Sequence, residues 1–295
     1  MIKLAIVGYG NVGYHALKAA LRAPDMEVVA VVRRNPSPHQ GIPPSIPVIP
    51  KLENMPVDVA LLTLPSRQVP EKAEALLQQG ISTVDSFDIH EEIPRLRSHL
   101  DGLARTQGKV AIIGAGWDPG TDSVIRVLME AMAPWGLTFT NFGPGISMGH
   151  SVAVRSLPGV RRALSYTLPL GFGRHRRLVY VEKEEGADEE SIREAILKDP
   201  YFRHDPTEVI FVPSTAPYED YGHGVCIERK GTSGETANQR FSFSMAVHNP
   251  SLTGQIMVAA ARAAVRQRPG AYTLPEIPPV DLLPGERGEI IQRLV

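Results

Sequence analysis

The sequence predicts an α/β protein, with a Rossmann-type doubly wound parallel sheet followed by a second α+β domain that carries a mixed or antiparallel sheet. Two observations predict this class. Apolar, strand-like segments alternate with helical segments over about the first 115 residues, which is typical of parallel βαβ units. Beyond residue 133, strand-like segments follow one another with few helices between them, which favours an antiparallel or mixed sheet.

The first predicted strand, at 2–7, leads directly into a glycine-rich turn and then a helix predicted at 14–22. After a strand, the spacing Gly-x-Gly-x-x-Gly is typical of dinucleotide binding, and a turn without a ligand is the alternative. The glycines allow a tight turn, close approach of a pyrophosphate and close packing of the helix, whose N–H groups face the phosphates. We therefore expect cofactor contacts from Gly8, Tyr9, Gly10, Asn11, Val12 and Gly13.

The second predicted strand, at 26–32, ends in Arg33-Arg34. In NAD-binding chains an acid about twenty residues past the glycines accepts a hydrogen bond from the ribose 2′-hydroxyl. Two guanidinium groups stand here instead, and they suit a 2′-phosphate. We therefore expect NADP as the cofactor. The alternative is that the arginines only end a strand at the surface.

The rest of the first domain continues the alternation. Residues 35–56 form a proline-rich connection, in which we expect one short strand near 48–49. After it we expect a strand at 58–65, a helix at 70–79, a strand at 81–88, a helix at 91–107 and a strand at 109–116. The carboxyl ends of strands in a doubly wound sheet face the cofactor. The residues expected near its nicotinamide half are therefore Thr63, Leu64, Pro65 and Ser66.

The second domain is predicted to be rich in strands. It has a helix at 121–133, strands at 137–142, 164–169, 178–182, 209–213, 225–230 and 241–247, and a helix at 188–197. Glycine-rich segments at 141–145, 147–151 and 221–224 are expected to be loops near a ligand, with ordinary tight turns as the alternative.

A long helix is predicted at 251–268, with Asn249 as its N-cap, Pro250 in its first turn and Gly270 after its end. The tail at 271–295 is expected to hold one short helix. The chain would thus contain a dinucleotide-binding domain at 1–118, closed by about 250–295, and a substrate-binding and dimerisation domain at 119–249.

Composition excludes several classes of function. The 31 Lys and Arg residues balance 32 Asp and Glu residues, so no basic surface for nucleic acid is expected. No apolar segment approaches the length of a membrane span, and the single Cys226 fits a reducing, cytoplasmic compartment. The nine histidines show no metal-ligand spacing, so we expect no metal.

Two carboxylates follow predicted strands of the first domain. Asp88 ends one strand and Asp118 comes just after another, so both should lie at the cofactor edge of the sheet. There they could hold a substrate ammonium, or one of them could move a proton. Helix capping or turn formation is the alternative, especially for Asp118 before Pro119-Gly120.

The motifs together closely resemble the meso-diaminopimelate D-dehydrogenase family, in particular its shorter, broader-specificity branch. The resemblance runs along the whole chain. It rests on Gly-Tyr-Gly-Asn-Val-Gly, Val-Val-Arg-Arg, Val-Asp-Ser-Phe-Asp-Ile-His, Ala-Gly-Trp-Asp-Pro-Gly-Thr-Asp-Ser, Asn-Phe-Gly-Pro-Gly-Ile-Ser-Met-Gly-His-Ser, Gly-His-Gly-Val and His-Asn-Pro.

The resemblance implies a homodimeric, NADP-dependent enzyme of the lysine and diaminopimelate pathway. It would oxidatively deaminate meso-2,6-diaminopimelate at its D-centre to L-2-amino-6-oxopimelate, ammonia and NADPH, with reductive amination as the reverse. Asp88 and Asp118 would hold the reacting amino group. The resemblance implies a pocket wall of Trp117, Phe142, Met148 and Gly149 beside them, and a distal L-centre held by Thr167, Arg177, His223 and Asn249.

Two alternatives remain. A Rossmann oxidoreductase for sugars or polyols would be expected to carry Glu-Lys-Pro where Thr63-Leu64-Pro65-Ser66 stands. A non-catalytic NADPH sensor would not account for the paired aspartates.

Overall fold

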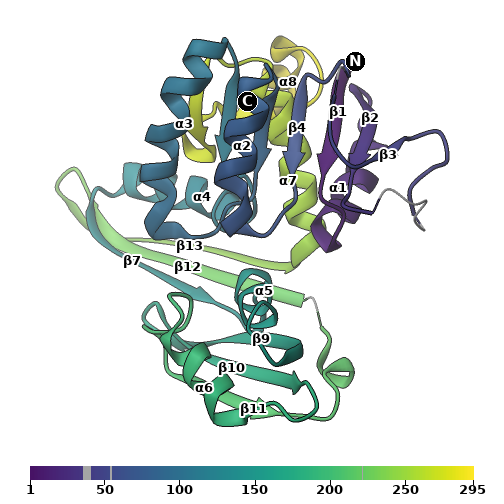
Figure 1. The fold of residues 1–295 in the computed structure, drawn as a ribbon. Coiled ribbons are helices and arrows are strands. Elements are labelled where there is room, and N and C mark those ends of the chain that lie inside the picture. The colour runs from purple at the N-terminus through teal and green to yellow at the C-terminus, as the bar shows by residue number, and fades with distance from the viewer. Residues whose placement is uncertain (36–40, 54, 221) are drawn as a thin grey trace. The chain divides into compact units, whose positions relative to one another are not determined.

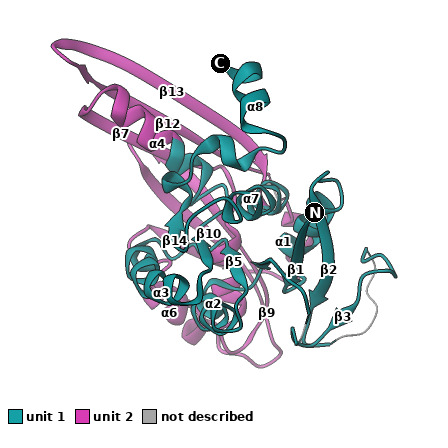
Figure 2. Ribbon diagram, turned by 90° about the horizontal axis from the view of Figure 1, so that it is seen from above, with its two compact units in different colours: residues 1–124, 250–295 teal, residues 125–249 magenta. Residues whose placement is uncertain are grey.

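The computed structural model describes residues 1–35, 41–53, 55–220 and 222–295. They form two units (Figure 2): the first consists of Met1–Val124 and Pro250–Val295, and the second of Ile125–Asn249. The chain passes between the units within helix α4 (Thr121–Met132) and after the first residue of helix α7 (Asn249–Ala264).

A seven-stranded sheet forms the centre of the first unit (Figure 1). Its strands are β1 (Ile2–Val7), β2 (Met26–Val32), β3 (Val48–Ile49), β4 (Val59–Leu62), β5 (Ser82–Asp85), β6 (Val110–Ile113) and β14 (Gly270–Thr273). Their order is β14-β6-β5-β4-β1-β2-β3, and every pair is parallel. From β1 the chain adds β2 and β3 on one side of the sheet and then β4, β5 and β6 on the other. The order of strands therefore reverses between β1 and β4, and folds of this kind bind ligands at that point. The predicted doubly wound sheet is confirmed.

Helices cover both faces of this sheet. Helices α2 (Val69–Gln78) and α3 (Ile93–Gln107) pack on one face, in a buried cluster that includes Leu62. Helices α1 (Asn11–Ala20) and α7 pack on the other, in a cluster that includes Leu61. Because the strands are buried on both faces, they read as continuous apolar runs. A short helix, α8 (Arg287–Leu294), ends the chain as predicted.

The second unit contains two sheets. One is antiparallel, in the order β13-β12-β7, with β7 (Trp135–Phe142), β12 (Gly222–Ser233) and β13 (Thr236–His248). The other is mixed, in the order β11-β10-β9-β8, with β8 (Gly145–Ile146), β9 (Val160–Gly171), β10 (Arg174–Lys183) and β11 (Thr207–Phe211). Helices α5 (Met148–Arg155) and α6 (Glu189–Lys198) share its buried core. The predicted mixed or antiparallel sheet is confirmed.

The glycine-rich segment at 147–151 is helical, so the prediction of a loop there is wrong. Ser147 has an extended backbone and α5 begins at Met148. The Ser151 hydroxyl donates to the carbonyl of Ser147 at 2.7 Å, and Val154 is buried in the core. Packing of this apolar side outweighs the low helix propensity of Gly149.

The other two glycine-rich segments are also more regular than predicted. Residues 141–142 end β7 and Gly145 opens β8, so the turn is confined to residues 143–144. Residues 222–224 open β12, and residue 221 lies outside the described residues. Parts of the predicted connection at 35–56, residues 36–40 and 54, also lie outside them.

Two helix starts and one strand differ from expectation. Helix α1 begins at Asn11, because Gly10 already occupies its N-cap position. Helix α7 begins at Asn249 itself, so the prediction of Asn249 as the preceding N-cap is wrong. Strand β14 falls in the predicted tail, where Asp101 accepts the N–H of Ala271 at 2.9 Å and β6 pairs alongside. Those long-range partners leave no local sequence pattern.

No described helix combines the length and apolar character needed to cross a membrane.

Candidate active site

Among the described residues, Gly10 is the one glycine of the turn with open space where a side chain would begin. Gly8 has a φ of +98°, and a Cβ there would lie 2.6 Å from the carbonyl oxygen of Thr63. A Cβ at Gly13 would lie 2.7 Å from the carbonyl oxygen of Gly8. At Gly10, by contrast, a Cβ would meet no described atom within 4 Å, and Asn11 beside it is exposed. The N-terminus of α1, with its positive dipole end, is therefore open to a pyrophosphate.

Arg33 lies beside this turn, directly after β2. Its guanidinium carbon is 6.0 Å from the ring centroid of Tyr9, and its backbone N–H donates to Ile49 at 2.9 Å. The Nη1 atom is buried and has no hydrogen-bond partner among the described residues. Arg34 is exposed. A buried guanidinium N–H without an acceptor fits a phosphate group, since burial of an unpaired donor is otherwise unfavourable.

The segment after β4 contacts the glycine-rich turn through its first residues and Asp88 through Ser66. The Thr63 hydroxyl donates to the carbonyl of Gly8 at 2.9 Å, and a Cβ on Gly8 would lie 3.0 Å from Leu64 Cδ2. Pro65 is exposed. The Ser66 hydroxyl instead donates to Oδ1 of Asp88 at 2.6 Å and accepts the Asp88 N–H at 3.2 Å. Ser66 therefore orients Asp88.

Asp88 and Asp118 lie in the loops after β5 and β6, a few residues beyond the ends of those strands. The Asp118 side chain is 17% exposed, and Nε2 of His90 lies 3.9 Å from its Oδ2. The carbonyl of Trp117, which is buried, accepts N–H from Asp122 in the first turn of α4 at 3.1 Å. Both aspartates thus lie at the carboxyl edge of the parallel sheet. His90 was not among the predicted residues, although it stands only two positions after Asp88.

A basic and polar cluster forms in the second unit. Thr167 on β9 lies directly opposite Arg177 on β10. Nη1 of Arg177 donates to the Thr167 hydroxyl, and Nε donates to Oδ2 of Asp205 at 2.7 Å. Thr167 is 1% exposed, so the cluster is built into the sheet. Asp205 was not predicted, because a single acid among charged residues gives no sequence signal.

His223, at the start of β12, is buried and neutral. Burial, together with the smaller effect of the charges of Arg177 and His175, lowers the pKa of its imidazole to about 4. Nδ1 lies 2.9 Å from the carbonyl oxygen of Gly224. Since a carbonyl can only accept, Nδ1 carries the proton and Nε2 is a hydrogen-bond acceptor.

The remaining predicted residues lie around this cluster or near it in the chain. Asn249 is buried and its Nδ2 donates to the carbonyl of Ile146 at 3.3 Å; β8, which contains Ile146, pairs with β9. The N–H of Phe142 donates to Nε2 of His175 at 2.9 Å. Met148 and Gly149 form the first turn of α5. A hydrogen bond therefore joins Thr167 and Arg177, the charge of Arg177 acts on His223, and Asn249 is connected to this cluster through β8.

Comparison with known proteins identifies the family. Residues 116–174, which include Trp117 and Asp118, match the family described as Diaminopimelic acid dehydrogenase C-terminal domain. A meso-diaminopimelate D-dehydrogenase from Bacteroides fragilis is 50% identical over 296 residues, covering 100% of this chain and 99% of that protein. The chain belongs to the meso-diaminopimelate D-dehydrogenase family. The resemblance that the motifs indicated is confirmed.

Solved structures of diaminopimelate dehydrogenases share its fold. A structure described as C. glutamicum DAP dehydrogenase in complex with DAP matches with a TM-score of 0.88 and 32% identity, covering 100% of this chain and 99% of that one. An engineered D-amino acid dehydrogenase bound to NADP+ matches with a TM-score of 0.88 and 30% identity, with the same coverage. The predicted fold class is confirmed by these matches as well.

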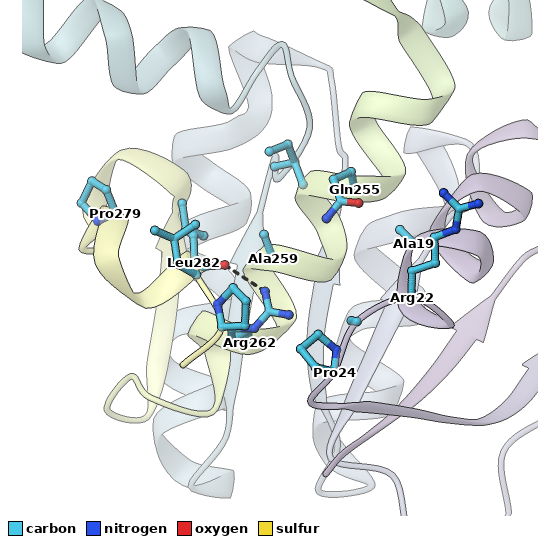
Figure 3. A pocket seen from close by; sticks show the side chains of 12 residues that line it. Ala19, Arg22, Pro24, Gln255, Ala259, Arg262, Pro279 and Leu282 are labelled. Carbon is cyan, nitrogen blue, oxygen red and sulfur yellow. Dashed lines mark hydrogen bonds between the residues drawn. The ribbon is translucent and has the colours of Figure 1, made fainter. Parts of the chain in front are cut away.

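This diaminopimelate dehydrogenase family member also carries an apolar hollow away from the predicted residues (Figure 3). It lies in the first unit, between the end of α1, α7 and the C-terminal segment, and its lining includes Ala19, Ala23, Ile256, Ala259, Leu282 and Pro284. Arg262 at its edge is held by Asp25, at 2.5 and 2.7 Å, and by the carbonyl of Leu282 at 2.9 Å. None of the predicted site residues lines it.

Proposed function

We propose that this chain catalyses the reversible, NADP-dependent oxidative deamination of meso-2,6-diaminopimelate at its D-centre. The products are L-2-amino-6-oxopimelate, ammonia and NADPH. The observation that carries the proposal is the 50% identity, over the full length of both chains, to a protein named for this activity. Family membership makes the chain an amino-acid dehydrogenase, as predicted.

NADP fits the glycine-rich turn and the arginines after β2. Gly8, Gly10 and Gly13 form the turn around its pyrophosphate, with Tyr9, Asn11 and Val12 between them. Arg33 and Arg34 bind its 2′-phosphate. The buried Nη1 of Arg33, which has no hydrogen-bond partner in the described part of the chain, supports this role. Thr63, Leu64, Pro65 and Ser66 line the nicotinamide end. Bound NADP supplies the hydride acceptor for the carbon that is oxidised.

Asp88 and Asp118 bind the ammonium group of the D-centre. Their carboxylates accept its N–H groups. One N–H proton leaves to solvent before the chemical step, and loss of hydride from Cα to NADP then turns the neutral amine into an iminium, whose developing positive charge the carboxylates stabilise. The Ser66 hydroxyl, 2.6 Å from Asp88, keeps that carboxylate oriented. Trp117, Phe142, Met148 and Gly149 shape this end of the pocket and limit its size. Water then adds to the imine and ammonia leaves.

Thr167, Arg177, His223 and Asn249 bind the distal L-centre. The guanidinium of Arg177 pairs with the distal carboxylate, and the Thr167 hydroxyl, which accepts from Arg177, donates its own proton to the same group. The neutral His223 presents Nε2 as an acceptor, which suits the distal ammonium. Holding one end of a symmetric zwitterion fixes which Cα–H reacts at the other end.

We further infer a homodimer in the cytoplasm. Apolar side chains of α4 and β7 in the second unit are exposed: Val127, Leu128, Met132, Trp135 (69%) and Leu137 (65%). A row of exposed apolar side chains on one helix and strand is typical of an interface between copies. Light scattering coupled to gel filtration should give twice the mass of one chain, and Trp135→Asp should shift it to the monomer.

The experiment that tests the proposed activity follows NADPH absorbance with purified protein and NADP. Meso-, L,L- and D,D-diaminopimelate are supplied separately. NADPH should form with the meso isomer and remain near background with L,L. Absence of NADPH with every isomer would overturn the proposal.

A further inference from the structure

Asp85, the last residue of β5, is a buried carboxylate that the proposed function does not use. It is 0% exposed and lies opposite Leu62 on the sheet face covered by α2 and α3. Its Oδ1 accepts two backbone N–H groups, from Phe87 at 2.9 Å and from Gly114 at 3.1 Å. Its own carbonyl oxygen accepts the N–H of Ala115 at 2.7 Å.

These three hydrogen bonds join the loops that carry the two candidate catalytic aspartates. Phe87 directly precedes Asp88 in the loop after β5. Gly114 and Ala115 open the loop after β6 that leads to Asp118. Gly114 has a φ of +64°, and a Cβ there would lie 3.1 Å from Cγ of Pro119, so this loop is folded back tightly. The single residue Asp85 therefore holds the first residues of the loop after β5 and of the loop after β6 by hydrogen bonds.

A carboxylate is an unfavourable choice at this position for stability alone. Its second oxygen, Oδ2, is buried with no hydrogen-bond partner among the described residues. Burial raises the pKa of Asp85 to about 6, so the group is mostly charged at neutral pH. An amide or an apolar residue would avoid the cost of burying a charge. What the carboxylate provides is a stronger bond to both N–H groups than a neutral acceptor can make.

We propose that Asp85 is a positioning residue that holds the Asp88 and Asp118 loops in one fixed relation, so that both carboxylates meet a single substrate ammonium. The inference rests on the proposed roles of Asp88 and Asp118. Asp85 is inaccessible, so it acts through backbone groups rather than by touching the substrate. Displacement of catalytic groups by even 1 Å costs about 100-fold in rate.

The test compares Asp85→Ala, which removes the side-chain oxygen that accepts both N–H groups, with Asp85→Asn, whose Oδ1 can still accept both. We expect Asp85→Ala to lower kcat about 100-fold, with the Kd for NADP within about threefold of wild type, and Asp85→Asn to recover all but about tenfold of kcat. Thr83→Val is the matched control, because Thr83 is buried on the same strand face and its hydroxyl has no partner among the described residues. It should leave kcat unchanged.

Hydrogen exchange of the backbone amides, measured without substrate, provides the second readout. In Asp85→Ala the loops at 86–92 and 114–120 should exchange faster, while β1 and α1 keep wild-type protection; in Asp85→Asn both loops should stay protected. If Asp85→Ala does not fold, Asp85→Ser takes its place, since a serine hydroxyl is too short to reach both N–H groups.

Wild-type kcat in Asp85→Ala, or equal loss of kcat in the Ala and Asn variants, would overturn the positioning role. Uniformly faster exchange across the first unit would also overturn it, because that marks a general structural defect. A wild-type protein inactive on every diaminopimelate isomer would instead refute the proposed function. The exchange measurement would still decide whether Asp85 orders the two loops.

Discussion

Nε of Arg177 donates a hydrogen bond to Oδ2 of Asp205 at 2.7 Å, while Nη1 of the same guanidinium donates to Thr167. The Arg177 side chain is 12% exposed and that of Asp205 24%. Two edges of the guanidinium are thus fixed by the protein, which sets the direction in which its other N–H groups point. This ion pair joins strand β10, which carries Arg177, to the turn before β11, which carries Asp205.

Loss of the Asp205 carboxylate should weaken binding of diaminopimelate and leave binding of NADP unchanged. With Asp205→Ala we expect the KM for diaminopimelate to rise about tenfold, since Arg177 loses its orienting partner. The KM for NADP should stay the same. Glu208→Gln, an exposed acid on β11, is the matched control. Steady-state kinetics with each substrate varied in turn checks this; parallel rises in both KM values would contradict it.

Removal of the two arginines after β2 should change cofactor preference. Arg33→Ala combined with Arg34→Ala is expected to raise the Kd for NADP about 100-fold, because charge-assisted bonds to the 2′-phosphate are lost. The Kd for NAD should change less than about threefold. Fluorescence titration measures both Kd values, with Arg22→Ala as the control, because Arg22 is an exposed arginine two residues after the end of α1. An equal rise in the Kd values for NAD and NADP would show that the arginines do not bind the 2′-phosphate.

Asp118→Asn should lower turnover far more than binding of NADP. We expect kcat to fall by about 100-fold or more, because a neutral amide stabilises developing positive charge poorly. The Kd for NADP, measured on the same preparation, should remain that of wild type. His90→Gln tests the neighbour at 3.9 Å and should have a smaller effect. Near-normal kcat in Asp118→Asn would refute the role assigned to that carboxylate.

His223 should make the second unit sensitive to acid. Its folded-state pKa of about 4 lies below the ordinary value of 6.5, so the unfolded chain binds more protons between these two values. The free energy of unfolding therefore falls as the pH drops from 6.5 toward 4. Relative to His223→Gln, wild type should lose on the order of 2–3 kcal/mol between pH 7 and pH 4.

Chemical denaturation at both pH values measures this difference. His204→Gln is the control, because His204 is exposed. An equal loss in wild type and His223→Gln would exclude a contribution from the buried imidazole.

Asp85 should act on stability in the opposite sense. Its folded-state pKa of about 6 lies above the ordinary 3.8, so the folded chain binds more protons between these values and stability falls as the pH rises through them. Asp85→Asn should raise the free energy of unfolding at pH 7 by about 1–2 kcal/mol, less than the full shift, since its amide N–H groups stay unpaired. At pH 4 the gain should vanish. Thermal or chemical unfolding at the two pH values checks it, and a gain of equal size at pH 4 would contradict it.

Much of the first unit could be predicted from local sequence. Strands β1 and β2 appear as apolar runs, and the glycine spacing after β1 requires the close approach that the carbonyls of Gly8 and Thr63 show. The parallel sheet, both of its helical layers and the mixed character of the second unit follow from the order of such segments. The motifs around Asp88, Asp118 and His223 also sufficed to indicate the family.

Only the tertiary structure decided which distant groups meet. Strand β14 forms because β6 offers a partner far away in the chain, and α5 forms because its apolar side is buried, although both segments have weak local patterns. The pairing of Arg177 with Asp205, and of Asp85 with the N–H of Gly114, is likewise invisible in the sequence. The reason is physical: propensity and periodicity act over a few neighbouring residues, whereas a buried charge is placed by partners that the fold brings to it.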